Sequence, residues 1–103
     1  MRVAVQALPD LTGKTLVEAE GILAEQRFEA ITNRGSYRRW QHADGSIVHM
    51  SDKGRIVREG RPVEGKSYRR RYAPSGELIV YDPSIRHDSS KPNTHDTGEL
   101  VKL

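Results

Sequence analysis

The chain has 103 residues, of which 30% are charged and 35% hydrophobic, so it fits one small globular domain and leaves too little apolar material for a second core. It contains no cysteine, which excludes disulfides, thiol nucleophiles and thiolate metal sites. No apolar run approaches the ~20 residues of a membrane span, and the first ten residues lack the basic and apolar regions of a signal peptide. We therefore expect neither an anchor nor a leader.

The net charge of +3 conceals a strongly basic middle of the chain. Residues 34–72 hold eleven Lys and Arg against four Asp and Glu, whereas residues 9–33 and 73–103 each carry a net negative charge. A basic middle between acidic ends favours a surface that binds a polyanion. A solvated, arginine-rich face of a sheet is the alternative reading.

The first predicted element is a helix over about 15–27. Thr15 and Glu18 form the two ends of a capping-box pattern, and the apolar residues after Thr15 recur at helical spacing. Pro9 and Gly13 belong to the loop before this helix. From Phe28 the pattern alternates, as in a strand that leaves a helix.

Short strand-like segments separated by turn residues follow. The expected strands are 37–42, 47–50, 55–58, 68–72 and 77–81. Asp44-Gly45 and Lys53-Gly54 are typical of hairpin turns, which predicts an antiparallel meander. The rest of the chain is polar and rich in turn residues, with Leu100, Val101 and Leu103 to dock it.

The predicted fold class is α+β: an N-terminal helix packed on a twisted antiparallel sheet of four to five strands, with a polar C-terminal tail. We expect one domain over 1–103, organised as a helix-containing part at 8–33, a basic sheet at 34–82 and the tail at 83–103.

Two resemblances to known families are visible. Residues 8–20, Leu-Pro-Asp-Leu-Thr-Gly-Lys-Thr-Leu-Val-Glu-Ala-Glu, resemble the opening of PASTA domains, but the glutamine and proline of the later PASTA pattern are missing. A second resemblance rests on an aromatic-x-His-x-Asp-Gly-Ser hairpin at 40–46 and a His-x-Thr-Gly-Glu motif at 95–99. These motifs resemble the C-terminal toxin domains of bacterial polymorphic toxins of the contact-dependent inhibition and Rhs classes. Many of those domains are ribonucleases of the barnase, EndoU and colicin group.

The toxin resemblance spans roughly residues 9–103 and carries several implications. It implies a helix followed by an antiparallel sheet, secretion and delivery into the cytoplasm of a target bacterium, and a cognate immunity protein. The immunity protein is expected to be acidic, because charge complementarity with the basic middle speeds and orients docking.

Cleavage of RNA by its own 2′-hydroxyl needs a base, an acid and a cation for the phosphorane charge, but no metal ion. The tail concentrates such groups between residues 86 and 97. The predicted catalytic residues are His95, His87, Lys91, Arg86 and Thr97. Ser90 and Thr94 are expected to contact phosphate through their hydroxyls. The alternative is that a polar tail holds such residues merely because it is exposed.

The basic middle supplies the predicted substrate-binding residues. These are Arg38, Arg39, Lys66, Tyr68, Arg69, Arg70 and Arg71. Aromatic residues interleaved with arginine suit base stacking and phosphate contact, although strand alternation explains 68–72 almost as well. His42 and His49 are expected to have hairpin or surface roles, and Trp40 is expected in the core.

The predicted function is a metal-independent endoribonuclease toxin acting on tRNA or another structured RNA. The expected partners are RNA and an acidic immunity protein, with no membrane, metal ion or small-molecule cofactor. Two other classes stay open: a non-enzymatic RNA- or partner-binding module, and a DNase or ADP-ribosyltransferase toxin.

Overall fold

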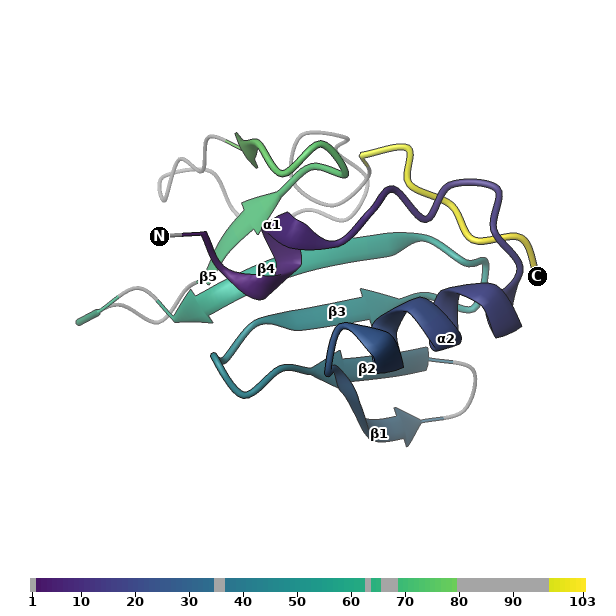
Figure 1. Cartoon of the computed structure of the whole chain (residues 1–103), viewed down its shortest axis with the longest axis horizontal. Helices are drawn as coiled ribbons and strands as arrows, with labels where there is room; N and C mark the ends of the chain where they lie inside the picture. Colours follow the sequence, from purple (N-terminus) through teal and green to yellow (C-terminus); the bar gives the residue numbers. More distant parts are fainter. Residues whose placement is uncertain (1, 35–36, 63, 66–68, 80–96) are drawn as a thin grey trace.

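The fold is a single antiparallel sheet with two helices on one of its faces, as seen in the computed structural model (Figure 1). The structure describes residues 2–34, 37–62, 64–65, 69–79 and 97–103. The elements are α1 (Ala4–Ala7), α2 (Leu16–Glu25), β1 (Glu29–Arg34), β2 (Tyr37–Gln41), β3 (Ile47–Met50), β4 (Ile56–Pro62), β5 (Arg69–Tyr72) and β6 (Leu78–Ile79). The predicted α+β class is confirmed. Among the described residues, none of the helices has the length and apolar character to cross a membrane.

Helix α2 begins where the capping box predicts and ends two residues earlier than predicted. The Thr15 hydroxyl accepts the Glu18 N–H at 3.2 Å, and the Glu18 carboxylate accepts the Thr15 N–H at 3.1 Å. At the other end Arg27 adopts a left-handed φ of 67°, and the Phe28 N–H donates to the Leu23 carbonyl at 2.8 Å. This pattern satisfies the last carbonyls of the helix and turns the chain into β1.

The six strands follow one another as a meander in the order β1-β2-β3-β4-β5-β6. The sheet has one strand more than the five expected at most, because the segment after α2 pairs with β2 as β1; β6 lies within the expected strand 77–81. Asp44 and Gly45 form the β2–β3 turn, in which Gly45 has a φ of 94°. The Asp44 carboxylate accepts the N–H of Ser46 and also that of Ala4 at the start of α1.

Strand alternation places the core between the sheet and the helices. Trp40, Val48, Met50, Ile56 and Tyr72 are buried in one cluster with residues of α1 and α2. Trp40 therefore has the core position predicted for it. We call the side of the sheet that carries these residues the helix face, and the other side the opposite face.

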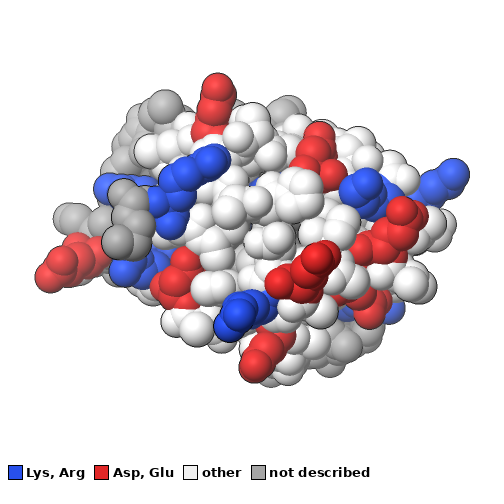
Figure 2. Space-filling view, in the orientation of Figure 1, with Lys and Arg blue, Asp and Glu red and all other residues white. Residues whose placement is uncertain are grey.

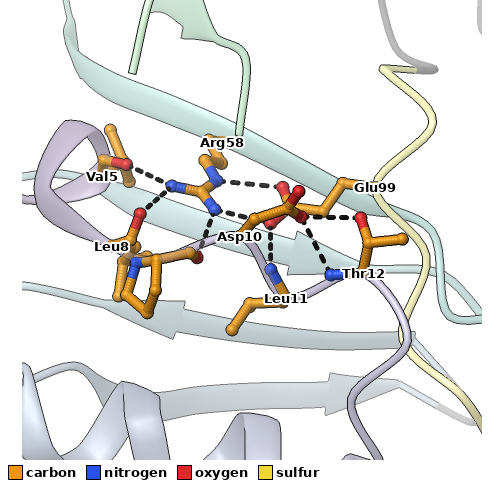
Figure 3. A network of polar contacts seen from close by, with 8 residues as sticks. Val5, Leu8, Asp10, Leu11, Thr12, Arg58 and Glu99 are labelled. Atoms are coloured by element: carbon orange, nitrogen blue, oxygen red, sulfur yellow. Dashed lines mark hydrogen bonds and ion pairs between the residues drawn. The ribbon is translucent and has the colours of Figure 1, made fainter. Parts of the chain in front are cut away.

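The C-terminal segment 97–103 is held by one buried polar network and by backbone pairing (Figure 3). Arg58, fully buried on β4, donates to the Glu99 carboxylate and to the carbonyls of Val5, Leu8 and Pro9. Val101 is buried as expected, but Leu100 and Leu103 are exposed. The segment is thus docked by Glu99, Val101 and its backbone rather than by all three apolar side chains.

Candidate functional site

Most of the predicted tail site lies outside the described residues. The tail residues outside the description are His95, His87, Lys91, Arg86, Ser90 and Thr94. Two residues of the predicted substrate-binding set, Lys66 and Tyr68, also lie outside it. Their roles stay predictions. Thr97 is described and half-buried, and its Oγ1 is buried with no hydrogen-bond partner among the described residues.

The five described arginines of the predicted phosphate-binding set do not share one surface. Arg38 and Arg70 alternate with Trp40 and Tyr72, which places them on the helix face. Arg39, Arg69 and Arg71 are therefore on the opposite face. On the helix face, basic and acidic side chains are dispersed around an uncharged centre (Figure 2). A phosphate-binding region built from strand arginines thus has to be sought on the opposite face.

A connected row of polar side chains crosses four strands on the opposite face. His49 on β3 contacts Glu59 on β4 through Nε2 and Oε1. Tyr37 on β2 lies on the other side of His49, with its hydroxyl 3.1 Å from Nδ1 and the two ring centroids 6.0 Å apart. Arg71 on β5 lies beyond Glu59, with 3.9 Å between Nε and Oε2. We call these four residues the Tyr37–Arg71 row.

The sheet register explains this arrangement. Glu59 and Arg71 are direct cross-strand neighbours, and His49 stands opposite Val57, one diagonal step from Glu59. Hairpin pairing alone therefore brings a histidine and a glutamate ten positions apart into contact. The side chains of His49 and Glu59 are each only 16% exposed, so their interaction is shielded from bulk water.

The charges around Glu59 hold it in the ionised form. Burial works to raise the pKa of its carboxyl, but the hydrogen bond and the charge of His49 outweigh burial, with help from Arg71 and Arg69. The net result is a pKa below the ordinary value. At neutral pH Glu59 is therefore an anion.

The pKa of Tyr37 is shifted in the opposite direction to that of Glu59. Burial, and after it the negative charge of Glu59, raises the pKa of the Tyr37 hydroxyl, against the charges of Arg39, Arg55 and Arg71. The hydroxyl thus stays protonated at neutral pH and acts as a hydrogen-bonding group on His49. Arg39, Arg55 and Arg71 are thus the cations whose charges act on this end of the row.

Those arginines give the row a cationic rim. Arg39 stands directly opposite His49 in the β2–β3 register. Its Nε is buried without a hydrogen-bond partner in the part of the chain that the structure describes. Arg69, by contrast, is occupied, since its Nη1 donates to the carbonyls of Gly45 and Gly60 at 2.6 and 3.0 Å. Of the predicted phosphate ligands, Arg39 and Arg71 are the ones that the fold brings to the row.

Sequence reasoning missed the row because it gave His49 a hairpin or surface role and gave Glu59 none. The signal was present: a His and a Glu placed on one face of two strands joined by a Lys53-Gly54 turn. His42 does have a hairpin role, because its Nδ1 accepts the Asp44 N–H at 3.0 Å. Within the described ranges, no three His, Asp or Glu side chains are grouped as metal ligands would be.

Comparison of this chain with family models, curated proteins and solved structures found no match. The site is therefore interpreted from its own geometry.

Proposed function

We propose that this chain is a toxin effector domain that cleaves RNA without a metal ion, with the His49–Glu59 contact as its acid–base centre. The observation that carries the proposal is that this pair lies between a tyrosine hydroxyl and an arginine, on the face that also holds Arg39. An acid, a base and a cation are the three requirements of 2′-hydroxyl attack on phosphate.

Each group has a definite task in this reaction. The Glu59 carboxylate takes the proton of the 2′-hydroxyl as the 2′-oxygen bonds to phosphorus. The bond from phosphorus to the 5′-oxygen breaks, and protonated His49 gives its proton to that oxygen. The products are a 2′,3′-cyclic phosphate and a free 5′-hydroxyl, so all atoms and protons are accounted for.

The contact between the two side chains then resets the site. After cleavage Glu59 carries a proton and His49 has lost one, and a hydrogen-bonded pair can return the proton directly. Substrate binding must open the contact so that each group faces one of the two oxygens. Arg39 and Arg71 are placed to stabilise the charge on the phosphorane, and low exposure strengthens that interaction.

The substrate and setting follow from the toxin resemblance and the charge distribution. We propose tRNA or another structured RNA as the substrate, delivery into the cytoplasm of a target bacterium, and neutralisation by an acidic immunity protein. The histidines of the tail, His87 and His95, keep their predicted acid–base role as a competing assignment of the catalytic residues.

The deciding experiment incubates the purified chain with total bacterial RNA and, separately, with duplex DNA, each with and without EDTA. His49→Gln, Glu59→Gln and His95→Ala are run beside the unchanged chain, with circular dichroism to verify folding. We expect RNA fragments that survive EDTA, and a loss of cleavage of about 100-fold or more in His49→Gln and Glu59→Gln.

The other outcomes point elsewhere. Loss in His95→Ala alone would move the acid–base centre to the tail. Cleavage of DNA that EDTA abolishes would indicate a metal-dependent DNase, and intact nucleic acid with modification that requires NAD would indicate an ADP-ribosyltransferase. Intact RNA that still binds the chain would indicate a binding module.

A further inference from the structure

A hollow of about 280 Å³ lies at the β1–β2 end of the sheet. It is lined by Arg27, Glu29, Ile31, Gln41, His42 and Ala43. None of these residues belongs to the Tyr37–Arg71 row or to the predicted tail site. The hollow combines hydrogen-bond donors and acceptors with the apolar side chains of Ile31 and Ala43.

The sheet register connects this hollow to the proposed reaction centre. Glu29 pairs with Gln41, Gln41 with Ile47 and Ile47 with Glu59, so these side chains form one cross-strand line on the opposite face. Strands are spaced ~4.8 Å apart, which puts Gln41 roughly 10 Å from Glu59. When the scissile phosphate of an RNA strand lies at Glu59, the base of that nucleotide or of the next one can therefore reach the hollow.

The polar groups of the hollow suit the edge of a nucleobase. Gln41 offers an amide that both donates and accepts, and Glu29 offers only acceptors. The Nδ1 of His42 is engaged by Asp44, at 3.0 Å from its backbone N and 3.2 Å from Oδ1, which leaves Nε2 as the ring nitrogen that can meet a ligand. The His42 ring is also fixed against Phe28, with 5.2 Å between centroids, so its position is set before any ligand binds.

We propose that this hollow is a subsite for an unpaired nucleobase that carries an exocyclic amino group, and that it disfavours uracil. The proposal rests on the proposed function and specifies its substrate. A carboxylate accepts from the amino group of adenine, cytosine or guanine, and an amide pairs well with an amino group beside a ring nitrogen. Uracil has no exocyclic amino group, so it lacks the donor that the Glu29 carboxylate would accept from the other three bases.

The test uses single-stranded RNA oligonucleotides that differ only in the base next to one scissile phosphate. We expect the unchanged chain to cleave the A, C and G substrates about 10-fold faster than the U substrate, measured as kcat/KM. Glu29→Gln can donate to a carbonyl, so it should narrow this ratio to about 2-fold or less. Glu64→Gln, which changes an exposed carboxylate outside the hollow, should leave the ratio unchanged.

A binding experiment separates the subsite from the cleavage reaction. AMP, CMP, GMP and UMP are titrated into ¹⁵N-labelled chain, and the backbone signals of residues 27–31 and 41–43 are followed. Selective shifts with UMP weakest support the subsite, even if the unchanged chain cleaves no RNA and the proposed reaction fails. Cleavage that ignores the neighbouring base, an unchanged ratio in Glu29→Gln, or shifts equal for all four nucleotides would overturn the subsite.

Discussion

Arg58 and Glu99 are 41 positions apart in the chain and form a two-point ion pair, with 2.9 Å between Nε and Oε1 and 2.5 Å between Nη2 and Oε2. Both side chains are fully buried. The remaining donors of Arg58 are taken by carbonyls of the N-terminal segment, and Glu99 also accepts the Leu11 N–H. One pair therefore joins the beginning, the middle and the end of the described chain (Figure 3).

Replacing Glu99 by Gln should destabilise the fold strongly. The change leaves the Arg58 guanidinium buried without its counter-charge, which costs about 3–5 kcal/mol in comparable pairs. Urea unfolding at pH 7 measures this loss. Glu77→Gln, at an exposed carboxylate, is the matched control and should stay within about 0.5 kcal/mol of the unchanged chain. Equal stability of the two variants would contradict a structural role for the pair.

A glycine on the turn between β3 and β4 fixes the same C-terminal segment. Gly54 has a φ of 85°, and its carbonyl accepts the Val101 N–H at 2.8 Å. A Cβ at Gly54 would collide with the carbonyl oxygen of Val101. At Gly65, where φ is 75°, an added Cβ meets no atom of the described chain within 4 Å.

Gly65→Ala should therefore cost only about 1 kcal/mol, for the left-handed backbone. Gly54→Ala should cost that amount and about 1–3 kcal/mol more, because the C-terminal segment must move. Thermal and urea unfolding of both variants give the comparison. If the two losses are the same, the close approach of Val101 to Gly54 contributes nothing.

Local signals in the sequence were enough for the helix and the meander. Thr15 and Glu18 lie one turn apart and act on each other directly, so their pattern predicts the start of α2 without any tertiary information. Asp44-Gly45 and Lys53-Gly54 similarly fix two hairpins. Helix α1 was not predicted, because its first N–H is satisfied by Asp44, 40 positions away.

The candidate site was harder to predict, because its residues are distinguished only by which face they occupy. Arg58 and Arg39 look alike in a basic stretch, yet Arg58 is buried in an ion pair on the helix face and Arg39 stands beside His49. The pairing of His49 with Glu59 depends on a register that the turn sets and that the sequence does not state. The tail residues His87 and His95 lie outside the described chain, so their roles remain predictions.

The lowered pKa of Glu59 makes part of the stability depend on pH. A carboxyl whose pKa is lower in the folded chain than its ordinary value of 4.5 contributes stability above that value and loses it as the pH falls through the folded pKa. The difference in unfolding free energy between the unchanged chain and Glu59→Gln should therefore be largest above pH 4.5 and shrink on acidification.

Urea titrations at several pH values from 5 to 3, a range that spans the ordinary carboxyl pKa and lies below the ordinary pKa of a histidine, measure this difference. Subtracting the unfolding free energy of the variant from that of the unchanged chain removes the contributions of other carboxyls with lowered pKa values, such as Asp10 and Asp44. A difference that stays constant or grows towards acidic pH would show that His49 and Arg71 do not stabilise the Glu59 anion.

The separation of neighbouring arginines onto two faces gives a direct test of the proposed RNA-binding face. Arg38 and Arg39 are adjacent in β2, but only Arg39 shares a face with the Tyr37–Arg71 row. Each phosphate contact on single-stranded RNA contributes about −0.7 to the slope of log affinity against log salt concentration. Arg39→Gln should therefore reduce the slope by about 0.7, and Arg38→Gln should leave it nearly unchanged.

Fluorescence anisotropy with a 2′-O-methyl oligonucleotide measures the slope, because that backbone lacks the attacking hydroxyl and stays intact during the titration. KCl is varied between 50 and 200 mM, over which a phosphate-dominated affinity falls steeply. The two variants carry the same change in net charge, so a difference between their slopes reports position alone. Equal reductions of the slope in the two variants would mean that the basic middle acts through its total charge. That result would contradict the proposal that the opposite face is the RNA-binding surface.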